Sequence, residues 1–350
     1  MSNNLVASDD SIIRAIILAG GEGTRLRPMT DHFPKPLARV ANKPMLEHII
    51  YGLRQSGIAQ IALATGYKAN AIEEYFGDGA RCDVHLQYVL EPFPLGSGGA
   101  IANVCTQINE YSQNTFVVAS ADVLHNADMN AALKLHRERG ALITIVCSEV
   151  ANPQDVGICE IESDGRIAAF YEKPAPGITD SRWANIALWI FEPQVLKEIP
   201  TGKFTRVEDE LFVHLLREGA PLYAYRHEGY WLDVGTAPRY LQAQRDALGQ
   251  RFPHHAHGSL INEYSVKAKS GNPRACEPSL LGNDCAIAKT ALLRSCVLGD
   301  GVQIGEGAIL ENCMIYDGAV IGAEAELKRA VVGPNVVVPD GAHLEDVMSF

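Results

Sequence analysis

The sequence predicts an α/β domain with a mostly parallel sheet, followed by a smaller domain folded as a parallel β-helix. Between Arg14 and Leu248, apolar runs of strand length alternate with helical patterns, as in a parallel sheet covered on both faces. From Leu281 onward, aliphatic positions recur instead in a repeating 6-6-5 step. A chain of 350 residues is long enough for two such domains.

The α/β domain is expected over residues 12–250. Its strands are short apolar runs, and its helices carry apolar residues at helical spacing. Ligands of such sheets bind beyond the carboxyl ends of the strands. The expected strands are 14–18, 61–65, 84–89, 115–119 and 143–148, and the expected helices are 45–55, 69–76, 100–108 and 129–139.

The β-helix is expected over residues 281–350. Three columns of apolar residues run through this segment, and each column recurs once in every complete 6-6-5 cycle, so all three have the same period. This shared period predicts a three-sided coil of hexapeptide repeats. Cys296 and Cys313 are separated by the same period and should stack in adjacent rungs. The columns begin at Leu281, Ile287 and Leu293, and the four rungs are 281–297, 298–314, 315–331 and 332–348.

Residues 251–280 are expected to form a linker and an irregular first turn of the coil. His254, His255 and His257 lie close together there. A metal site is one interpretation, but a solvated linker is favoured, because no cysteine or carboxylate stands beside them at ligand spacing.

Composition excludes several classes of protein. A net charge of −12 argues against nucleic acid as a partner, since binding a phosphate backbone needs a basic surface. No apolar run is long enough to span a membrane, and no signal peptide is recognisable at the start. The eight cysteines form no Cys-x-x-Cys pair and are expected to be reduced. These features predict a cytoplasmic protein without a membrane partner.

Residues 16–36 carry the strongest functional signal. An apolar strand runs into Gly20, Gly21 and Gly23, and Arg25 and Lys35 follow. Glycines let backbone N–H groups approach a polyanion, and basic side chains bind phosphate oxygens. The stretch therefore predicts a nucleoside triphosphate site. It is neither a Walker loop, which needs Gly-Lys-Ser/Thr, nor the Gly-x-Gly-x-x-Gly loop of dinucleotide folds.

The string Gly-Gly-Glu-Gly-Thr-Arg-Leu-Arg-Pro-Met-Thr, followed by Pro-Lys-Pro, resembles the signature of sugar-1-phosphate nucleotidylyltransferases. The resemblance implies the Rossmann-like sheet of nucleotide-diphospho-sugar transferases. With the hexapeptide tail, it is closest to mannose-1-phosphate guanylyltransferase-like proteins, which implies a left-handed β-helix. A second glycine segment, residues 95–99, resembles the family's Leu-Gly-Thr-Ala-Gly and is expected to lie against the base. The resemblance implies nucleotide binding by Leu18, Gly20, Gly21, Gly23, Thr24, Gly96 and Ser97.

The resemblance also implies a Mg²⁺ site on two aspartates. Asp122 follows the strand 115–119, with Ser120 where relatives often have Asn or Gly. Asp233 lies in Gly-Tyr-Trp-Leu-Asp-Val-Gly, which resembles Gly-x-Trp-x-Asp-x-Gly. Mg²⁺ prefers carboxylate oxygens while it bridges phosphates. Taken alone, Asp122 would be interpreted as a helix cap.

A sugar-phosphate site is implied by three further segments. Lys173, in Glu-Lys-Pro, would bind the phosphate of the sugar, and Glu172 a hydroxyl. Ala187 stands where the family's Asn-x-Gly has glycine, so its methyl group puts the fit of the sugar in question. Glu208 and Asp209 are equally well explained as an acidic pair in the site and as a helix cap. The residues implied here are Gly157, Glu172, Lys173 and Asn185.

The implied reaction joins an NTP to a sugar 1-phosphate and releases pyrophosphate. The sugar phosphate is already ionised at pH 7, so the reaction needs positioning and charge neutralisation rather than a general base. The favoured substrates are GTP and mannose 1-phosphate. The implied catalytic residues are Arg25, Lys35, Asp122, Lys173 and Asp233.

Several alternatives stay open. UDP-, ADP- or dTDP-forming enzymes acting on glucose 1-phosphate, or on a heptose or cyclitol phosphate, would share these motifs. A non-catalytic subunit that senses nucleotide sugars is a different class, but such subunits usually lose a metal aspartate or the signature arginine. Acyl transfer by the β-helix is less favoured, since His343 is the one histidine in its rungs. The apolar last rung predicts a homo-oligomer.

Overall fold

The computed structural model describes residues 12–252, 256–261, 274–275 and 278–350. The chain forms two compact units. The first, called the sheet unit, combines the chain up to Gly21 with Ile49–Trp231, and the second, called the β-helix unit, combines Glu22–His48 with Leu232–Phe350. The compact units therefore divide the chain differently from the domains expected from sequence pattern, because two segments flanking the sheet belong with the β-helix.

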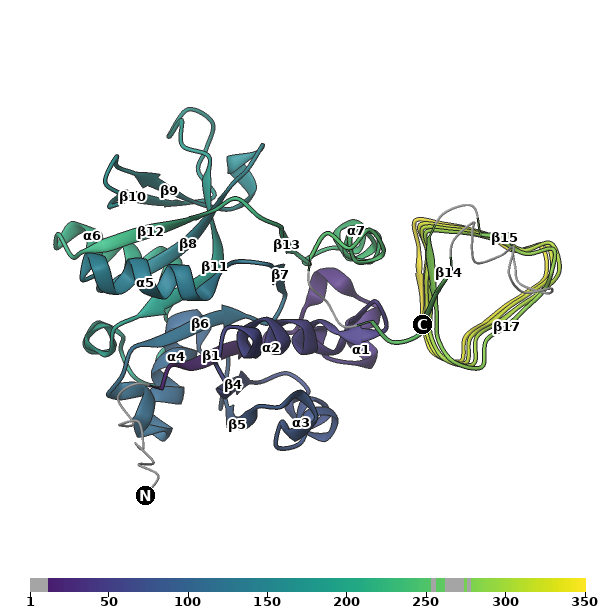
Figure 1. The fold of residues 1–350 in the computed structure, drawn as a ribbon, viewed down its shortest axis with the longest axis horizontal. Coiled ribbons are helices and arrows are strands. Elements are labelled where there is room, and N and C mark those ends of the chain that lie inside the picture. The colour runs from purple at the N-terminus through teal and green to yellow at the C-terminus, as the bar shows by residue number, and fades with distance from the viewer. Residues whose placement is uncertain (1–11, 253–255, 262–273, 276–277) are drawn as a thin grey trace, which may run out of the picture. The chain divides into compact units, whose positions relative to one another are not determined.

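The sheet unit contains a nine-stranded sheet in the order β10-β9-β11-β6-β1-β4-β5, and β8 joins β11 to β12 (Figure 1). Strands β6, β1, β4 and β5 run parallel, which confirms the predicted Rossmann-like sheet. Strand β11 runs antiparallel to β6 and β8. The strands are β1 (Arg14–Ala19), β4 (Gln60–Thr65), β5 (His85–Leu90), β6 (Phe116–Ser120), β8 (Ile143–Glu149), β9 (Gly157–Ile161), β10 (Ile167–Glu172), β11 (Trp183–Phe191) and β12 (Leu222–His227), with the short strands β7 (Val123–His125) and β13 (Trp231–Asp233) outside this sheet.

Within the sheet unit, α4 (Gly96–Gln107), α5 (Met129–Arg139) and α6 (Phe212–Arg217) pack against this sheet. The Asp128 side chain caps α5 by accepting from the Ala131 N–H at 3.0 Å, and Gly140 ends that helix with φ +56°. Trp189 packs edge-on against Phe212 at 5.6 Å in the core. The α-helices are α1 (Met29–His32), α2 (Met45–Gln55), α3 (Ala69–Phe76), α4 (Gly96–Gln107), α5 (Met129–Arg139), α6 (Phe212–Arg217) and α7 (Ala237–Leu248).

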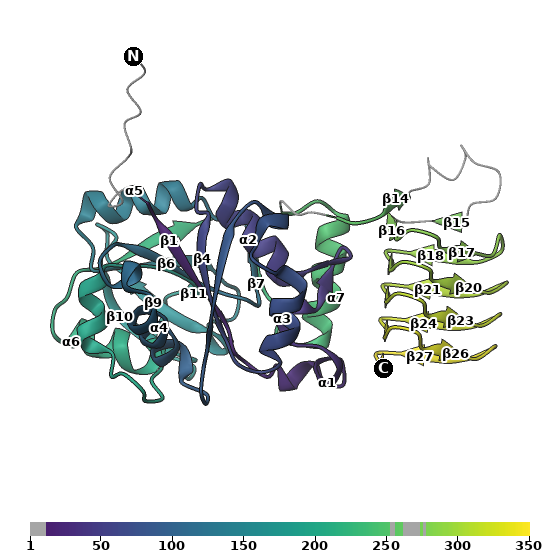
Figure 2. The same ribbon diagram turned by 90° about the horizontal axis from the view of Figure 1, so that it is seen from below.

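The C-terminal part of the β-helix unit is a left-handed parallel β-helix with the predicted register. Leu281 pairs with Leu298, Leu298 with Ile315, and Ile315 with Val332. The coil is triangular when viewed along its axis, and its rungs stack in order (Figures 1 and 2). Its strands are β14 (Ser259–Ile261), β15 (Arg274–Ala275), β16 (Ser279–Leu281), β17 (Ala286–Ile287), β18 (Leu292–Arg294), β19 (Val297–Leu298), β20 (Gln303–Ile304), β21 (Ile309–Glu311), β22 (Met314–Ile315), β23 (Val320–Ile321), β24 (Glu326–Lys328), β25 (Val331–Val332), β26 (Val337–Val338), β27 (His343–Glu345) and β28 (Met348–Ser349).

The interior of the coil is apolar, as the columns predict. Leu293, Leu310 and Leu327 pair in register and are buried. Cys296 and Cys313 are buried in adjacent rungs with free thiols. Burial raises the pKa of the Cys296 thiol well above its usual value, which keeps it uncharged.

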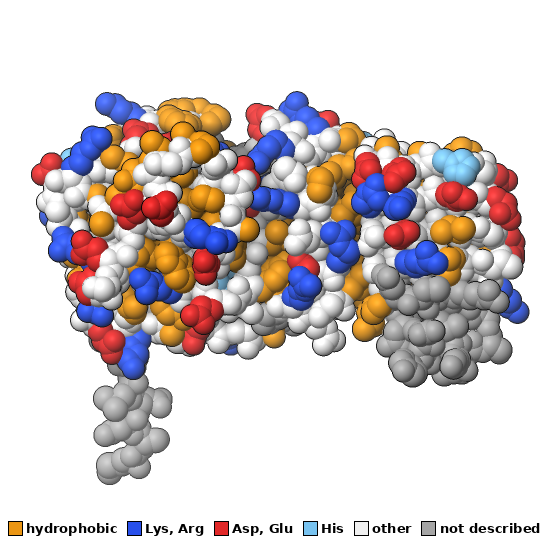
Figure 3. Space-filling view, turned by 90° about the horizontal axis from the view of Figure 1, so that it is seen from above, with side chains coloured by type: hydrophobic (Ala, Val, Ile, Leu, Met, Phe, Trp, Pro, Cys, Tyr) orange, Lys and Arg blue, Asp and Glu red, His pale blue; other side chains and the backbone are white. Residues whose placement is uncertain are grey.

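The predicted histidine cluster is only partly described, since His254 and His255 lie outside the described residues, as does Cys276. The His257 Nε2 atom lies 3.1 Å from Asp300 Oδ2 and 3.0 Å from Asn283 Nδ2. Acidic and basic side chains are interspersed on the face in Figure 3. No helix in the described part of the chain is both long and apolar enough to cross a membrane.

Candidate active site

The ends of β1 and β6 place the first part of the predicted nucleotide loop beside Asp122. Leu18 pairs with Ser120, and the Leu18 carbonyl accepts from the Ala121 N–H at 3.0 Å. A methyl group on Gly20 would lie 2.2 Å from Glu91 Oε1, so only glycine fits there without displacing that side chain. The sheet unit therefore brings Leu18, Gly20 and Asp122 together at the carboxyl ends of the neighbouring strands β1 and β6.

The second part of the loop is held within the β-helix unit. Gly23 has φ +66°, and a methyl group there would lie 3.0 Å from Lys35 Cβ. The Gly23 carbonyl accepts from Thr30 Oγ1 at 3.1 Å and from the Leu26 N–H at 2.9 Å. The stem of Lys35 thus packs against the glycine turn, and Lys35 is only 8% exposed. Arg25, in the same turn, is exposed.

Asp233 lies in the same unit as Arg25. A methyl group on Gly235 would lie 3.0 Å from Arg25 Nη2 and 3.2 Å from Asp233 Oδ1, so both side chains border one glycine. Arg239 Nη1 donates to Asp233 Oδ2 at 3.1 Å. The sequence interpretation did not include Arg239; its signal was an arginine in the first turn of a helix that begins shortly after the aspartate motif.

Asp122 is oriented by the residue that departs from the family pattern. Ser120 Oγ donates to Asp122 Oδ1 at 2.5 Å. Asp122 and Asp233 belong to different compact units, and no group of three or more His, Cys, Asp or Glu side chains suited to a metal occurs among the described residues. Mg²⁺ is often held by one or two carboxylates together with phosphates and water, so each of the two aspartates is a suitable donor, and a Mg²⁺ site on them stays a prediction.

The glycine run at the start of α4 packs against the segment before α6. The Gly98 N–H donates to the Thr205 carbonyl at 2.8 Å, and a methyl group on Gly96 would lie 2.6 Å from that oxygen. Ser97 Oγ donates to Glu208 Oε2 at 2.7 Å and accepts from the Val207 N–H at 2.9 Å. These contacts explain why glycines are required, whereas base binding by Gly96 and Ser97 stays a prediction.

The predicted sugar-site residues Gly157 and Glu172 are neighbours across the β9–β10 pair. Arg206 Nη2 lies 3.5 Å from Glu172 Oε1, and Lys173 Nζ lies 3.7 Å from the same oxygen. Burial, followed by the charge of Glu208, raises the pKa of Glu172. Glu208 thus lies close to Ser97 and to Glu172 rather than serving only as a helix cap. Arg206 is a second residue that the sequence interpretation missed.

Asn185 maintains an irregularity in β11. Its Oδ1 atom accepts from the Ala187 N–H at 3.0 Å and from Trp189 Nε1 at 2.8 Å. Ala187 has φ +55°, a conformation that favours glycine. The usual glycine of the family motif is explained by this backbone conformation, and the extra methyl group adds backbone strain.

We predict that Gly157→Ala raises the KM for the sugar phosphate by roughly 10-fold. The reason is that the predicted hydrogen bond between the Glu172 carboxylate and a sugar hydroxyl would be lost. The new methyl group would lie 2.6 Å from Phe170 Cζ and 2.8 Å from Glu172 Oε2, so Glu172 must shift. Initial rates at saturating NTP measure this effect. Gly52→Ala is the control, because nothing lies within 4 Å of its added methyl group and its backbone is not in the left-handed region. An unchanged KM for the Gly157 variant would contradict the assignment.

Comparison with known proteins identifies the family to which the chain belongs. A family model described as nucleotidyl transferase matches residues 14–250, and a model described as the GlmU-like C-terminal hexapeptide matches residues 264–346. The chain is 37% identical over 253 residues to the UTP–glucose-1-phosphate uridylyltransferase of Synechocystis sp., covering 69% of this chain and 64% of that protein. It is 36% identical over 237 residues to the mannose-1-phosphate guanylyltransferase of Mycobacterium tuberculosis, covering 67% and 65%.

The chain thus spans slightly less than two thirds of the length of these two relatives. Among solved structures, HddC from Yersinia pseudotuberculosis in complex with GMP-PN superposes with a TM-score of 0.57 at 25% identity, over 67% of this chain and 100% of that one. The match of the nucleotidyl transferase model covers more than half of the sequence and includes both the glycine loop and the aspartate motifs. The chain therefore belongs to the nucleotidyl transferase family.

Proposed function

We propose that this protein transfers a nucleotidyl group from an NTP to a sugar 1-phosphate and releases pyrophosphate, with GTP and mannose 1-phosphate as substrates. The observation that carries the proposal is the glycine turn at Gly23, which packs on the buried stem of Lys35 within a matched family segment. The guanylyltransferase relative supports the choice of substrates. The similarity to a uridylyltransferase makes UTP with glucose 1-phosphate the second candidate.

In this proposal, a phosphate oxygen of the sugar 1-phosphate attacks the α-phosphorus of the NTP. The new P–O bond forms as the bond to the pyrophosphate oxygen breaks, and no proton has to be removed from the nucleophile. Arg25 and Lys35 hold the triphosphate and stabilise charge on the departing pyrophosphate, while Lys173 orients the second phosphate. Asp122 and Asp233 would hold a Mg²⁺ ion, which supplies charge neutralisation between the two anionic substrates.

The test is pyrophosphate release by the full chain across a matrix of GTP, UTP, ATP and dTTP with mannose, glucose, heptose and cyclitol phosphates, with Mg²⁺ and with EDTA. We expect turnover with GTP and mannose 1-phosphate and its loss in EDTA. Turnover with UTP and glucose 1-phosphate instead would select the second candidate. Nucleotide-sugar binding without turnover of any pair would contradict the proposal and favour a sensing subunit.

We also propose that the protein is a homo-oligomer through the β-helix, since the partly buried Leu344 and Val347 lie in its last rung. Light scattering of the purified chain should give a mass larger than 38.0 kDa. A monodisperse monomer would contradict this.

A further inference from the structure

One column of the β-helix departs from the others in its side chains. The residue after each Leu281-type position is Gly282, Gly299, Tyr316, Gly333 and Phe350, one in each successive turn of the coil. A methyl group on Gly299 would lie 2.3 Å from Asp317 Oδ1, and one on Gly333 would lie 2.6 Å from Phe350 Cδ1. The column therefore consists of glycines, which have no room for a side chain, and two aromatic residues.

Both aromatic residues pack on the segment that carries Lys35. The Tyr316 ring lies 5.3 Å from Phe33 and 5.9 Å from Phe350. Phe350 also lies 5.9 Å from Phe33 and 5.3 Å from His32. Tyr316 is buried, so these contacts exclude water from the base of this segment.

Hydrogen bonds fix the other end of the same segment. The Arg39 N–H donates to the Tyr316 hydroxyl at 3.2 Å, and the Arg39 carbonyl accepts from the Tyr240 hydroxyl at 2.6 Å. The two hydroxyls lie 2.8 Å apart, and burial raises the pKa of Tyr316 to about 12, which keeps it a donor. Arg39 Nη1 also donates to Asp317 Oδ1 at 2.7 Å. Lys35 thus lies between two anchored points, Phe33 and Arg39.

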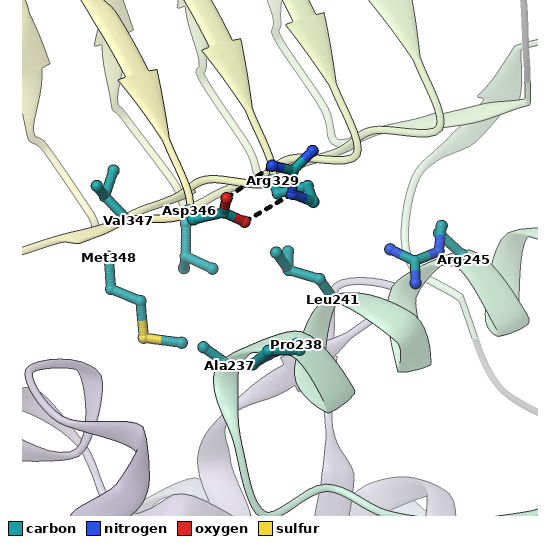
Figure 4. A pocket seen from close by; sticks show the side chains of 9 residues that line it. Ala237, Pro238, Leu241, Arg245, Arg329, Asp346, Val347 and Met348 are labelled. Carbon is teal, nitrogen blue, oxygen red and sulfur yellow. Dashed lines mark hydrogen bonds and ion pairs between the residues drawn. The ribbon is translucent and has the colours of Figure 1, made fainter.

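Elsewhere, the contact between α7 and the rungs is less well packed. A cavity of about 130 Å³ separates Ala237, Leu241 and Arg245 of α7 from Arg329 and Met348 of the last rungs (Figure 4). Arg329 is paired with Asp346 of the next rung, on the β-helix side of this space. Side chains that border a cavity lose packing contacts on one side, so this part of the contact between α7 and the rungs contributes little to holding the two together. Residues 29–40 are instead held by the aromatic column, by Tyr240 and by Gln244, whose Nε2 atom also donates to the Arg39 carbonyl at 2.6 Å.

We propose that Tyr316 and Phe350 are positioning residues for the nucleotide, so that the β-helix sets the affinity for the NTP. The inference rests on the proposed function, because it takes Lys35 and Arg25 as triphosphate ligands. Loss of a Tyr316 contact lowers the fraction of molecules in which the loop is ordered, and the apparent affinity for the NTP falls by the same factor. Binding of the sugar phosphate, predicted on residues of the sheet unit, does not change.

The test is Tyr316→Phe, which keeps the ring and removes the hydroxyl. We expect the KM for the NTP, and the NTP dissociation constant measured by calorimetry without sugar phosphate, to rise by about 2- to 10-fold, where the upper value is the full effect of one buried hydrogen bond. The kcat at saturating NTP and the KM for the sugar phosphate should change by less than about twofold. Phe350→Ala should shift the same constants in the same direction.

Tyr111→Phe is the matched control, because it removes a buried hydroxyl that donates to the Ala15 carbonyl at 3.0 Å and is otherwise the same change. It should lower the melting temperature without raising the NTP constants. A Tyr316 variant with a lower kcat, a lower melting temperature and unchanged NTP constants would overturn the inference and leave a structural role alone. Absence of turnover in the unmodified protein would contradict the proposed function instead, while NTP binding would still test the positioning role.

Discussion

Asp122→Ala is expected to lower kcat by about 100-fold or more, the scale of removing one preorganised electrostatic group. Asp122 follows β6 at the edge of the sheet where β1 ends, and Ser120 fixes one of its oxygens. Without the carboxylate, one of the two proposed Mg²⁺ ligands is lost, and repulsion between the two anionic substrates increases. Steady-state rates of pyrophosphate release at saturating substrates measure the effect.

Asp128→Ala is the matched control for this change. Asp128 is the N-cap of α5, so its removal should cost about 1 kcal/mol of stability and leave kcat unaltered. Asp233→Ala should lose at least about 100-fold as well. Near-normal turnover by either the Asp122 or the Asp233 variant would exclude that residue as a metal ligand.

Lys35→Ala is expected to lower kcat/KM for the NTP by about 100-fold, because a charge-assisted contact to the triphosphate is lost from a buried site. The stem of Lys35 packs against Gly23, so the ammonium group is held with little freedom. Lys35→Arg should recover only part of the loss, since the larger guanidinium must fit the same narrow space. Rates at varied NTP and saturating sugar phosphate test both variants.

Lys43→Ala is the control for the lysine series. Lys43 Nζ pairs with Glu47 Oε1 at 2.9 Å on the same helix–turn segment, and pairs of this kind contribute about 0.5 kcal/mol. Its kcat/KM should stay within about twofold of the unmodified protein. Equal losses for the Lys35 and Lys43 variants would show that the Lys35 effect is not specific.

Most of the predicted elements could be found because the spacing of apolar residues along the sequence differs between helices, strands and the β-helix. The repeating 6-6-5 step specified the register of the β-helix down to the pairing of Leu293 with Leu310. The five expected strands and four expected helices are all present, with small shifts at their ends. Strands β9, β10, β11 and β12 were not among the expected strands, and the antiparallel direction of β11 was not predicted, because apolar runs do not encode strand direction. The grouping of residues 22–48 with the β-helix was not predicted either. It depends on contacts between residues far apart in the sequence, such as Arg39 with Tyr316.

The candidate site was predictable to a lesser degree. Motifs located the glycines and charged residues. The structural reasons why glycine is needed at these positions differ from those expected. Gly96 and Gly98 are needed for close approach to the Thr205 carbonyl, and the φ of Ala187 explains the family's glycine. Arg206 was missed because a single arginine near a carboxylate has no local signature, and Arg239 was missed because its position in the first turn of the helix after the aspartate motif was not used.

The most direct test of the central claim is ³¹P NMR of the full chain with GTP, mannose 1-phosphate and Mg²⁺. The account predicts that the nucleoside triphosphate signals decline while those of an NDP-sugar diphosphate and of pyrophosphate appear in equal amounts. UTP with glucose 1-phosphate is run in parallel as the second candidate. If neither pair yields an NDP-sugar, or if the NTP is consumed without a sugar–diphosphate product, the account is contradicted.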